Sequence, residues 1–287
     1  QNLTIDFILG FTNKTIKSFL NTKRNSHYVD KVKFSINNIE IEQIHNSTLW
    51  GMYRGMNTSP YLLQSILIAL EVYLLNMAKV LEKKELQTLL TYLLIKAETS
   101  SITSVVTSIV VAYPEKTFDI ALELFKVKEF IESDFNRAIV EHTNHMDMSF
   151  DIISQVHSIE REAEAKREHR KVSLLNIMFN YQYLSGKYKK EKLLIEEVID
   201  NYYKKINKNP EENKDWKLFI SNHIDLRNMT EKEEVTKDNQ IIVSFEPKLD
   251  DELSNYKKNV LDSIDKSSKY TQLSLWSSCK FDNNEEH

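Results

Sequence analysis

Glycine and proline are scarce in this chain, and this scarcity constrains the fold more than any other feature. There are four residues of each among 287. The turns of β-sheets and the loops that bind cofactors depend on these two residues. We therefore expect long helices joined by few corners, in a chain long enough to bury a substantial core.

The middle of the chain, residues 59–207, carries the strongest helical pattern. Apolar residues recur every three or four positions in the segments 60–81, 84–97, 100–113, 114–127, 129–142 and 189–206. The third of these segments is small or apolar almost all round, which predicts a helix that is buried on every side. Because the links are short, we expect stacked antiparallel helices, as in an α-solenoid.

The region before it, residues 1–58, combines a helix with a short hairpin. Apolar spacing predicts a helix over residues 4–22. Residues 31–44 then alternate between apolar and polar on either side of Asn37 and Asn38. Asparagine tolerates the positive φ of a two-residue turn, so this pattern predicts a β-hairpin.

The region after it, residues 208–287, is predicted to be a C-terminal helical extension. It contains a short helix around Trp216, a charged loop over 230–240, a strand over 241–247 and a helix over about 250–266. The expected fold is therefore mainly α, with an N-terminal hairpin and a short C-terminal strand.

Two of the helical stretches are unusual in composition, one strongly apolar and the other with a strongly charged part. Residues 60–81 are apolar enough to suggest a membrane span, but Glu71 interrupts them. A carboxylate near a bilayer centre costs about 2.5–3.5 kcal/mol, so we expect a buried core helix instead. Residues 148–185 are expected to be one longer helical stretch, and the charged residues 165–171 within it, "AKREHRK", are expected to face solvent.

The composition and motifs exclude several functions. The net charge of -4 and pI of about 6.1 provide no basic field for nucleic acid. The patterns GxxxxGK[ST] and GxGxxG are absent, so we expect no nucleotide cofactor bound through them. Cys279 is the only cysteine, so no disulfide forms within the chain, which fits a cytoplasmic location. The start at Gln1, without a signal-peptide pattern, favours a segment of a longer protein.

One cluster could bind a metal. Glu141, His142, His145 and Asp147 lie within seven positions, and the two histidines could share a helix face. This cluster would support a metal-dependent hydrolase. The polar end of a helix explains the same residues more simply, with histidine near the C-terminal dipole, so no metal site is assigned.

The stretch "LWGMYRG", residues 49–55, is the most distinctive in the chain. Trp50 and Tyr53 could anchor a corner in the core, with Gly51 and Gly55 supplying positive φ and Arg54 pairing with a carboxylate. This structural interpretation is favoured for the fragment alone. In the functional alternative Trp50, Tyr53 and Arg54 form an interdomain contact, in which the arginine reaches a neighbouring domain.

Several phrases occur in a familiar order: "LWGMYRGMNTSPYLLQSILIALEVYLL", "SSITSVVTSIVVAYPE", "EHRKVSLLNIMF", "HIDLRNM" and "IIVSFEPKLDDEL". Together they resemble the long helical region of large bacterial P-loop ATP-binding proteins of the STAND type. The resemblance covers about residues 6–276 and includes no catalytic motif.

The resemblance implies a non-catalytic helical scaffold that contacts adjoining domains or a partner protein. In that family an effector and a P-loop NTPase precede such a region, some members act in antiviral defence, and the helical region senses a phage protein and drives oligomerisation. No membrane or nucleic-acid partner is expected. The alternatives are a free-standing helical adaptor and the metal-dependent hydrolase described above.

Overall fold

The computed structural model describes residues 2–21, 29–55, 60–143, 167–235 and 241–282. Over these residues the fold is mainly helical, as predicted, and it divides into two compact units, residues 1–198 and 199–287. The described part of the predicted segment 1–58 belongs to the first unit, unit 1, and the segment 208–287 belongs to the second, unit 2.

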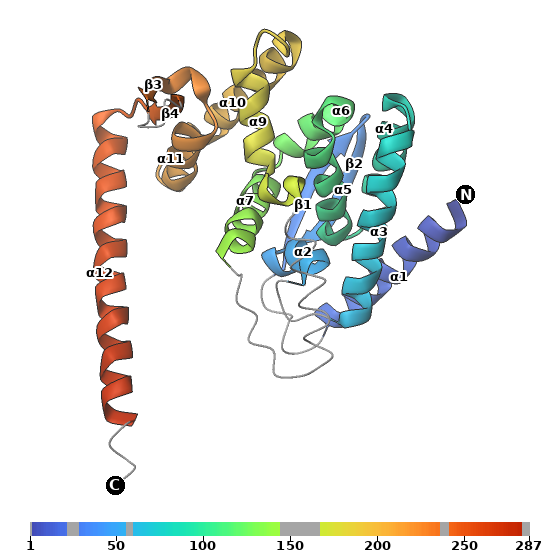
Figure 1. The fold of residues 1–287 in the computed structure, drawn as a ribbon, viewed down its shortest axis with the longest axis horizontal. Helices are drawn as coiled ribbons and strands as arrows, with labels where there is room; N and C mark the ends of the chain where they lie inside the picture. The colour runs from blue at the N-terminus through green and yellow to red at the C-terminus, as the bar shows by residue number, and fades with distance from the viewer. Residues whose placement is uncertain (1, 22–28, 56–59, 144–166, 236–240, 283–287) are drawn as a thin grey trace. The chain divides into compact units, whose positions relative to one another are not determined.

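The elements of each unit follow in chain order (Figure 1). Unit 1 contains α1 (Asn2–Leu20), β1 (Asp30–Ile36), β2 (Ile39–His45), α2 (Ser47–Gly51), the 3-10 turn η1 (Met52–Arg54), α3 (Tyr61–Val80), α4 (Lys83–Lys96), α5 (Ser100–Ala112), α6 (Pro114–Phe125), α7 (Lys128–Thr143), the 3-10 turn η2 (Glu168–Lys171) and α9 (Leu174–Tyr183). Helix α10 (Lys189–Ile206) crosses the boundary. Unit 2 continues with α11 (Lys214–His223), η3 (Leu226–Asn228), β3 (Met229–Val235), β4 (Ile241–Pro247) and α12 (Asp251–Asp282).

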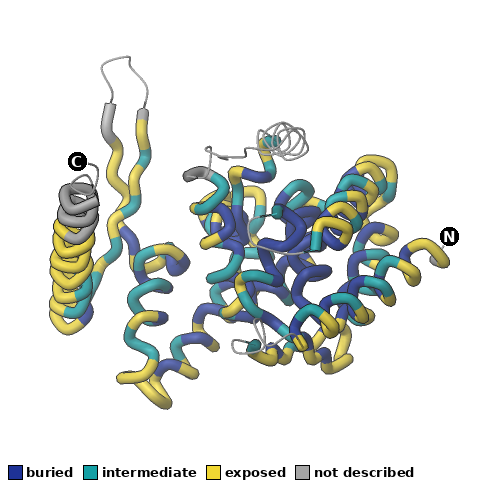
Figure 2. Tube along the Cα trace, turned by 90° about the horizontal axis from the view of Figure 1, so that it is seen from below, coloured by how far each residue is buried: buried dark blue, intermediate teal, exposed yellow. Residues whose placement is uncertain are grey.

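Helix α5 is the centre of unit 1. It contacts α3, α4 and α6, and strand β2 lies against it as well. Every residue from Ser100 to Val111 is buried, which confirms the prediction. Figure 2 shows buried segments in dark blue. Two hydroxyl groups of α5, those of Ser104 and Thr107, donate to carbonyls of the same helix at 2.9 Å. The hydroxyl groups of Ser101, Thr103 and Ser108 donate to neighbouring elements, which offsets the cost of burying them.

The predicted hairpin forms between β1 and β2. The strands pair antiparallel with Ile36 opposite Ile39, and Asn37 and Asn38 take φ values of 51° and 64°. Both values lie in the left-handed region that a two-residue hairpin turn requires.

The hairpin is fastened to the helices by backbone and side-chain bonds. The Ile44 amide donates to the Glu98 carbonyl at 2.9 Å. Gln43 donates to the Leu94 carbonyl at 3.2 Å and accepts from Thr103 at 2.6 Å. A two-stranded hairpin is marginal alone, so these bonds and its apolar inner face stabilise it.

Helix α3 is the one described helix whose length and composition would let it cross a membrane. Its buried positions recur every three or four residues, which is the spacing of a core-facing stripe: Leu63, Leu67, Leu70, Leu74 and Ala78. Glu71 lies beside this stripe and is completely buried. Helix α3 is therefore a core helix of unit 1, as the sequence predicted.

Three local predictions were wrong. In the described part of 148–185, η2 ends at Lys171 and Ser173 caps a new helix, so the stretch is not one helix; residues 148–166 lie outside the described residues. Residues 229–235 form β3 instead of a loop, because pairing with β4 satisfies their backbone. Helix α12 continues to Asp282 rather than ending near Lys266.

The hairpin turn yields a test of the fold. Replacing Asn38 by valine should destabilise unit 1 by about 1–3 kcal/mol, because a β-branched residue is strained at positive φ. The matched control Asn38→Gly should be close to neutral, since glycine adopts this conformation freely. Urea unfolding of both variants measures the difference, and equal stabilities would contradict the turn geometry.

Candidate functional site

The corner that contains Arg54 is built into the core. Asn46 caps α2 by accepting a hydrogen bond from the Leu49 amide at 2.7 Å, and Ser101 donates to the Leu49 carbonyl at 2.8 Å. Trp50 and Tyr53 are each 1% exposed. The structure therefore shows the anchored aromatic corner of the structural interpretation.

The glycines of this corner differ from each other. Gly55 has φ of 65° and ends η1 in the left-handed conformation, as predicted. Gly51 has φ of −82°, so the positive φ suggested for it is wrong. Only Gly55 supplies the turn that directs the chain out of the corner.

Arg54 belongs to a buried cluster of three arginines and three carboxylates, which we call the arginine–carboxylate network. Its members come from η1, α3, α7 and η2: Arg54, Glu71, Asp134, Arg137, Glu141 and Arg170. All six side chains are at least nine-tenths buried. Their formal charges cancel, which allows the cluster to lie in a low-dielectric interior.

Helix α7 provides three of the members from one face. Asp134, Arg137 and Glu141 are spaced by three and four residues, so they line up along the helix. Arg137 donates to Asp134 at 2.7 Å and also pairs with Glu141. The other oxygen of Glu141 accepts from Arg54, so this carboxylate joins η1 to α7.

Asp134 collects hydrogen bonds from three directions. It accepts from Trp50 Nε1 at 3.3 Å, from Arg137 and from the backbone amide of Leu174 at 2.7 Å. The last bond falls in the first turn of α9, where a carboxylate also interacts favourably with the helix dipole. Asp134 thus connects α2, α7 and α9.

Arg170 forms the other half of the network. It donates to Glu71 of α3, and Ser108 of α5 donates to the second oxygen of that carboxylate. His169 Nε2 lies 3.6 Å from Glu71. The Arg170 guanidinium also lies 5.6 Å from the centre of the Tyr53 ring, a cation–π distance.

Arg137 also donates hydrogen bonds to backbone carbonyls. Its guanidinium donates to the carbonyls of Arg170 at 3.1 Å and Val172 at 2.8 Å. These bonds fasten η2 onto α7. The network therefore holds the segments on both sides of residues 144–166 against each other.

The surroundings shift the pKa values of two members of this region. Burial opposes the charge of Arg137, but the surrounding groups, Asp134 foremost and Glu141 among them, together outweigh it, so the pKa of Arg137 lies well above the ordinary value. Burial raises the pKa of Tyr53. The guanidinium therefore stays charged and the phenol neutral at all ordinary pH values, as a permanent structural linkage requires.

Sequence reasoning found Arg54 but missed its partners. Residues 165–171 were expected to face solvent, and this was wrong for Arg170, which is 1% exposed because Glu71 neutralises it in the core. The available signal was Glu71 itself. A carboxylate on the apolar face of a buried helix needs a partner, but sequence alone does not say which cation supplies it.

The predicted metal cluster lies mostly outside the described residues. His145, Asp147 and the side chain of His142 belong to that part of the chain. Glu141 is described, and both of its oxygens face arginines. The metal site and the interdomain contact by Trp50, Tyr53 and Arg54 therefore stay predictions.

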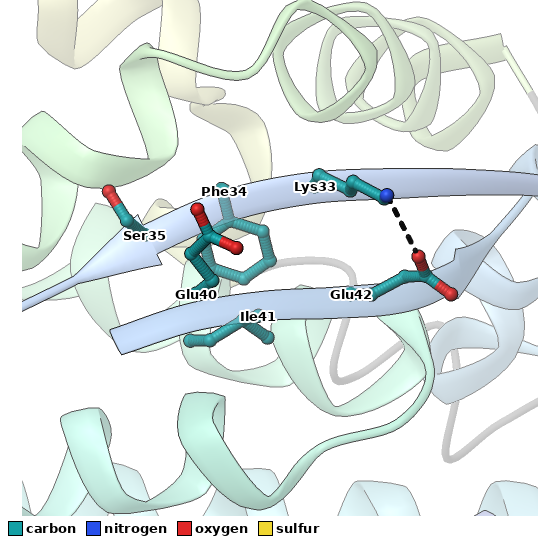
Figure 3. A pocket seen from close by; sticks show the side chains of 6 residues that line it. All are labelled: Lys33, Phe34, Ser35, Glu40, Ile41 and Glu42. Atoms are coloured by element: carbon teal, nitrogen blue, oxygen red, sulfur yellow. Dashed lines mark ion pairs between the residues drawn. The ribbon is translucent and has the colours of Figure 1, made fainter. Parts of the chain in front are cut away.

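An open hollow also lies on the β1–β2 hairpin, lined by Lys33, Phe34, Ser35, Glu40, Ile41 and Glu42 (Figure 3). Lys33 and Glu42 pair across it at 3.4 Å. Hydrogen bonds from Lys31 and Lys33 lower the pKa of Glu42. The ion-paired side chains at this hollow, Lys33 and Glu42, are at least 42% exposed, whereas those of the arginine–carboxylate network are at least nine-tenths buried.

Loss of Arg54 should be costly. Arg54→Ala is expected to destabilise unit 1 by about 3–5 kcal/mol, because it leaves the buried Glu141 short of a cation. The control is Lys17→Ala, which removes an exposed ion pair with Glu98 and should cost less than about 1 kcal/mol. Hydrogen exchange of unit 1 peptides measures both, and a cost for Arg54→Ala no larger than the control's would contradict the network.

His45 should make stability depend on pH. Burial lowers its pKa to about 4, from 6.5, against a small opposing effect of Asp30. The unfolded chain therefore binds a proton below pH 6.5 that the folded chain refuses until about pH 4. Stability from this group is full above pH 6.5 and is lost as the pH falls towards 4, by up to about 3 kcal/mol.

The variant His45→Gln isolates this effect. The other described histidine with a lowered pKa, His223, lies in unit 2 and is unchanged in the variant. The unfolding free energy of the wild type minus that of the variant should fall as the pH falls from 6.5 to 4. A difference that stays constant across this range would contradict the assignment.

No protein-family model and no curated protein matches this sequence.

Proposed function

We propose that this chain is a non-catalytic helical scaffold and coupling segment of a larger bacterial ATP-binding protein of the STAND type. It contacts adjoining domains or a protein partner, and its place is the cytoplasm. Some members of that class act in phage defence, and we include this role in the proposal. The main support for the proposal is the arginine–carboxylate network, whose charged groups form ion pairs with one another.

A network of this kind favours a mechanical role. It joins η1, α3, α7 and η2 by charge-assisted hydrogen bonds in the dry interior, where such bonds are strong. Elements that are joined in this way move as one body. A body that moves as a unit transmits a displacement from one contact surface to another, which is what coupling between domains requires.

The sequence phrases agree with this emphasis. Arg54 and Glu71 fall in the first phrase that resembles the STAND class, Ser108 in the second and Arg170 in the third. Three phrases that are distant along the chain thus meet through the Glu71 carboxylate and the Tyr53 ring. The phrases that resemble the STAND class therefore contain residues of the arginine–carboxylate network, which joins elements of the core.

Exposed apolar side chains support contact with other proteins. On α1, Leu3 is 88% exposed and Phe7 is 67% exposed. Phe7 stacks on Phe11 one turn away, with ring centres 6.2 Å apart. Adjacent large apolar side chains in water are typical of a protein-contact surface.

The sequence of the gene on both sides of this segment tests the proposal. An in-frame P-loop upstream, followed by a hydrophobic strand that ends in aspartate, is the expected result. A start codon directly before Gln1 and a stop codon directly after His287 would contradict it. That result would favour the alternative of a free-standing helical adaptor.

A further inference from the structure

Among the described side chains of helix α12, those that contact the rest of unit 2 lie near the beginning of the helix. Leu253 is buried, the Tyr256 hydroxyl donates to Asp215 at 2.8 Å and Lys257 donates to Asn222 at 3.0 Å. After Val260 every described side chain of the helix is exposed, as the yellow part of α12 in Figure 2 shows. The helix nevertheless continues to Asp282.

Such a stretch needs a partner to be stable. Helices without tertiary contacts are marginal in water, and most helical stability in proteins comes from packing of one apolar face. Serine has a lower helix propensity than alanine or leucine. Six serines lie in this stretch: Ser263, Ser267, Ser268, Ser274, Ser277 and Ser278.

The stretch has a face that suits another helix. The positions 261, 264, 268, 271 and 275 follow the alternating spacing of three and four residues of a coiled-coil seam, and Leu, Ile, Ser, Thr and Leu occupy them. Leu261 is 55% exposed and Ile264 is 59% exposed. The small residues in the middle of the seam allow two helices to approach closely.

Charge along α12 identifies the occupant and its direction. Residues 251–265 contain four acidic and two basic side chains, a net charge of −2. Residues 266–282 contain three basic and one acidic side chain, a net charge of +2. Two copies that pack antiparallel place the acidic half of each helix against the basic half of the other, and their helix dipoles also oppose.

We propose that a second copy of this chain packs antiparallel on the face of α12 formed by residues 261, 264, 268, 271 and 275. The parallel arrangement would place like charges together along the whole helix. This inference rests on the proposed scaffold function, because it names the partner of one of the scaffold's surfaces.

Analytical ultracentrifugation of the full chain tests the pairing. The wild-type chain should sediment as a dimer. Ile264→Lys should raise the dissociation constant at least tenfold, because it places a charge in the seam. Tyr270→Lys is the matched control, since Tyr270 is 72% exposed but lies on another side of the helix, and it should leave the dimer intact.

A wild-type monomer at the highest attainable concentration would overturn the inference, as would a dimer that Ile264→Lys leaves unchanged. Either result would leave the gene-sequence test of the scaffold proposal unaffected, so the two failures are distinguishable.

A disulfide experiment tests the direction. In a Cys279→Ser background, Leu261→Cys should form no disulfide between copies in a sample that sediments as a dimer, because antiparallel packing separates the two positions. A disulfide between the two copies at position 261 would show parallel packing and overturn the proposal.

Discussion

The ion pair between Glu71 and Arg170 joins parts of unit 1 that are 99 residues apart along the chain. Both side chains are almost completely inaccessible to water. A charge buried alone would cost several kcal/mol, so each residue is tolerable only because the other is present. The burial of Glu71 on α3 therefore depends on η2, which supplies Arg170.

The same dependence extends through the rest of the network. Arg137 pairs with both Asp134 and Glu141, and it also donates to the backbone carbonyls of Arg170 and Val172. Through its bond to Glu141, Arg54 joins the corner that follows the hairpin to the same network. Because neighbouring pairs share members, the network links the early, middle and late parts of unit 1 in a way that apolar packing alone does not specify.

Local patterns predicted much of the fold. The paired asparagines at 37 and 38 predicted the hairpin turn, the division between segments 100–113 and 114–127 matches the boundary between α5 and α6, and the apolar run of 100–113 predicted a buried helix. Each of these signals acts within a few residues. Strand β3 escaped prediction because its solvated, charged face shows no apolar alternation, and its pairing with β4 supplies the missing information.

The site was harder to predict because its chemistry is distributed. Arg170 lies in a run of charged residues that is typical of a solvated face, and nothing nearby distinguishes it from Arg167 or Lys171. Its burial depends on Glu71, on a different helix. A partnership across that separation is visible only in three dimensions, although the buried carboxylate signalled that some partner must exist.

A double-mutant cycle between Glu71 and Arg170 tests directly whether these two buried charges depend on each other. Glu71→Gln, Arg170→Met and the combined variant would be compared with wild type by urea unfolding, followed by hydrogen exchange in unit 1. We expect each single change to lower the free energy of unfolding by about 3–5 kcal/mol. The combined change should lower it by less than the sum of the two, by a margin of at least about 2 kcal/mol. Additive costs would contradict the claim that these two charges depend on each other.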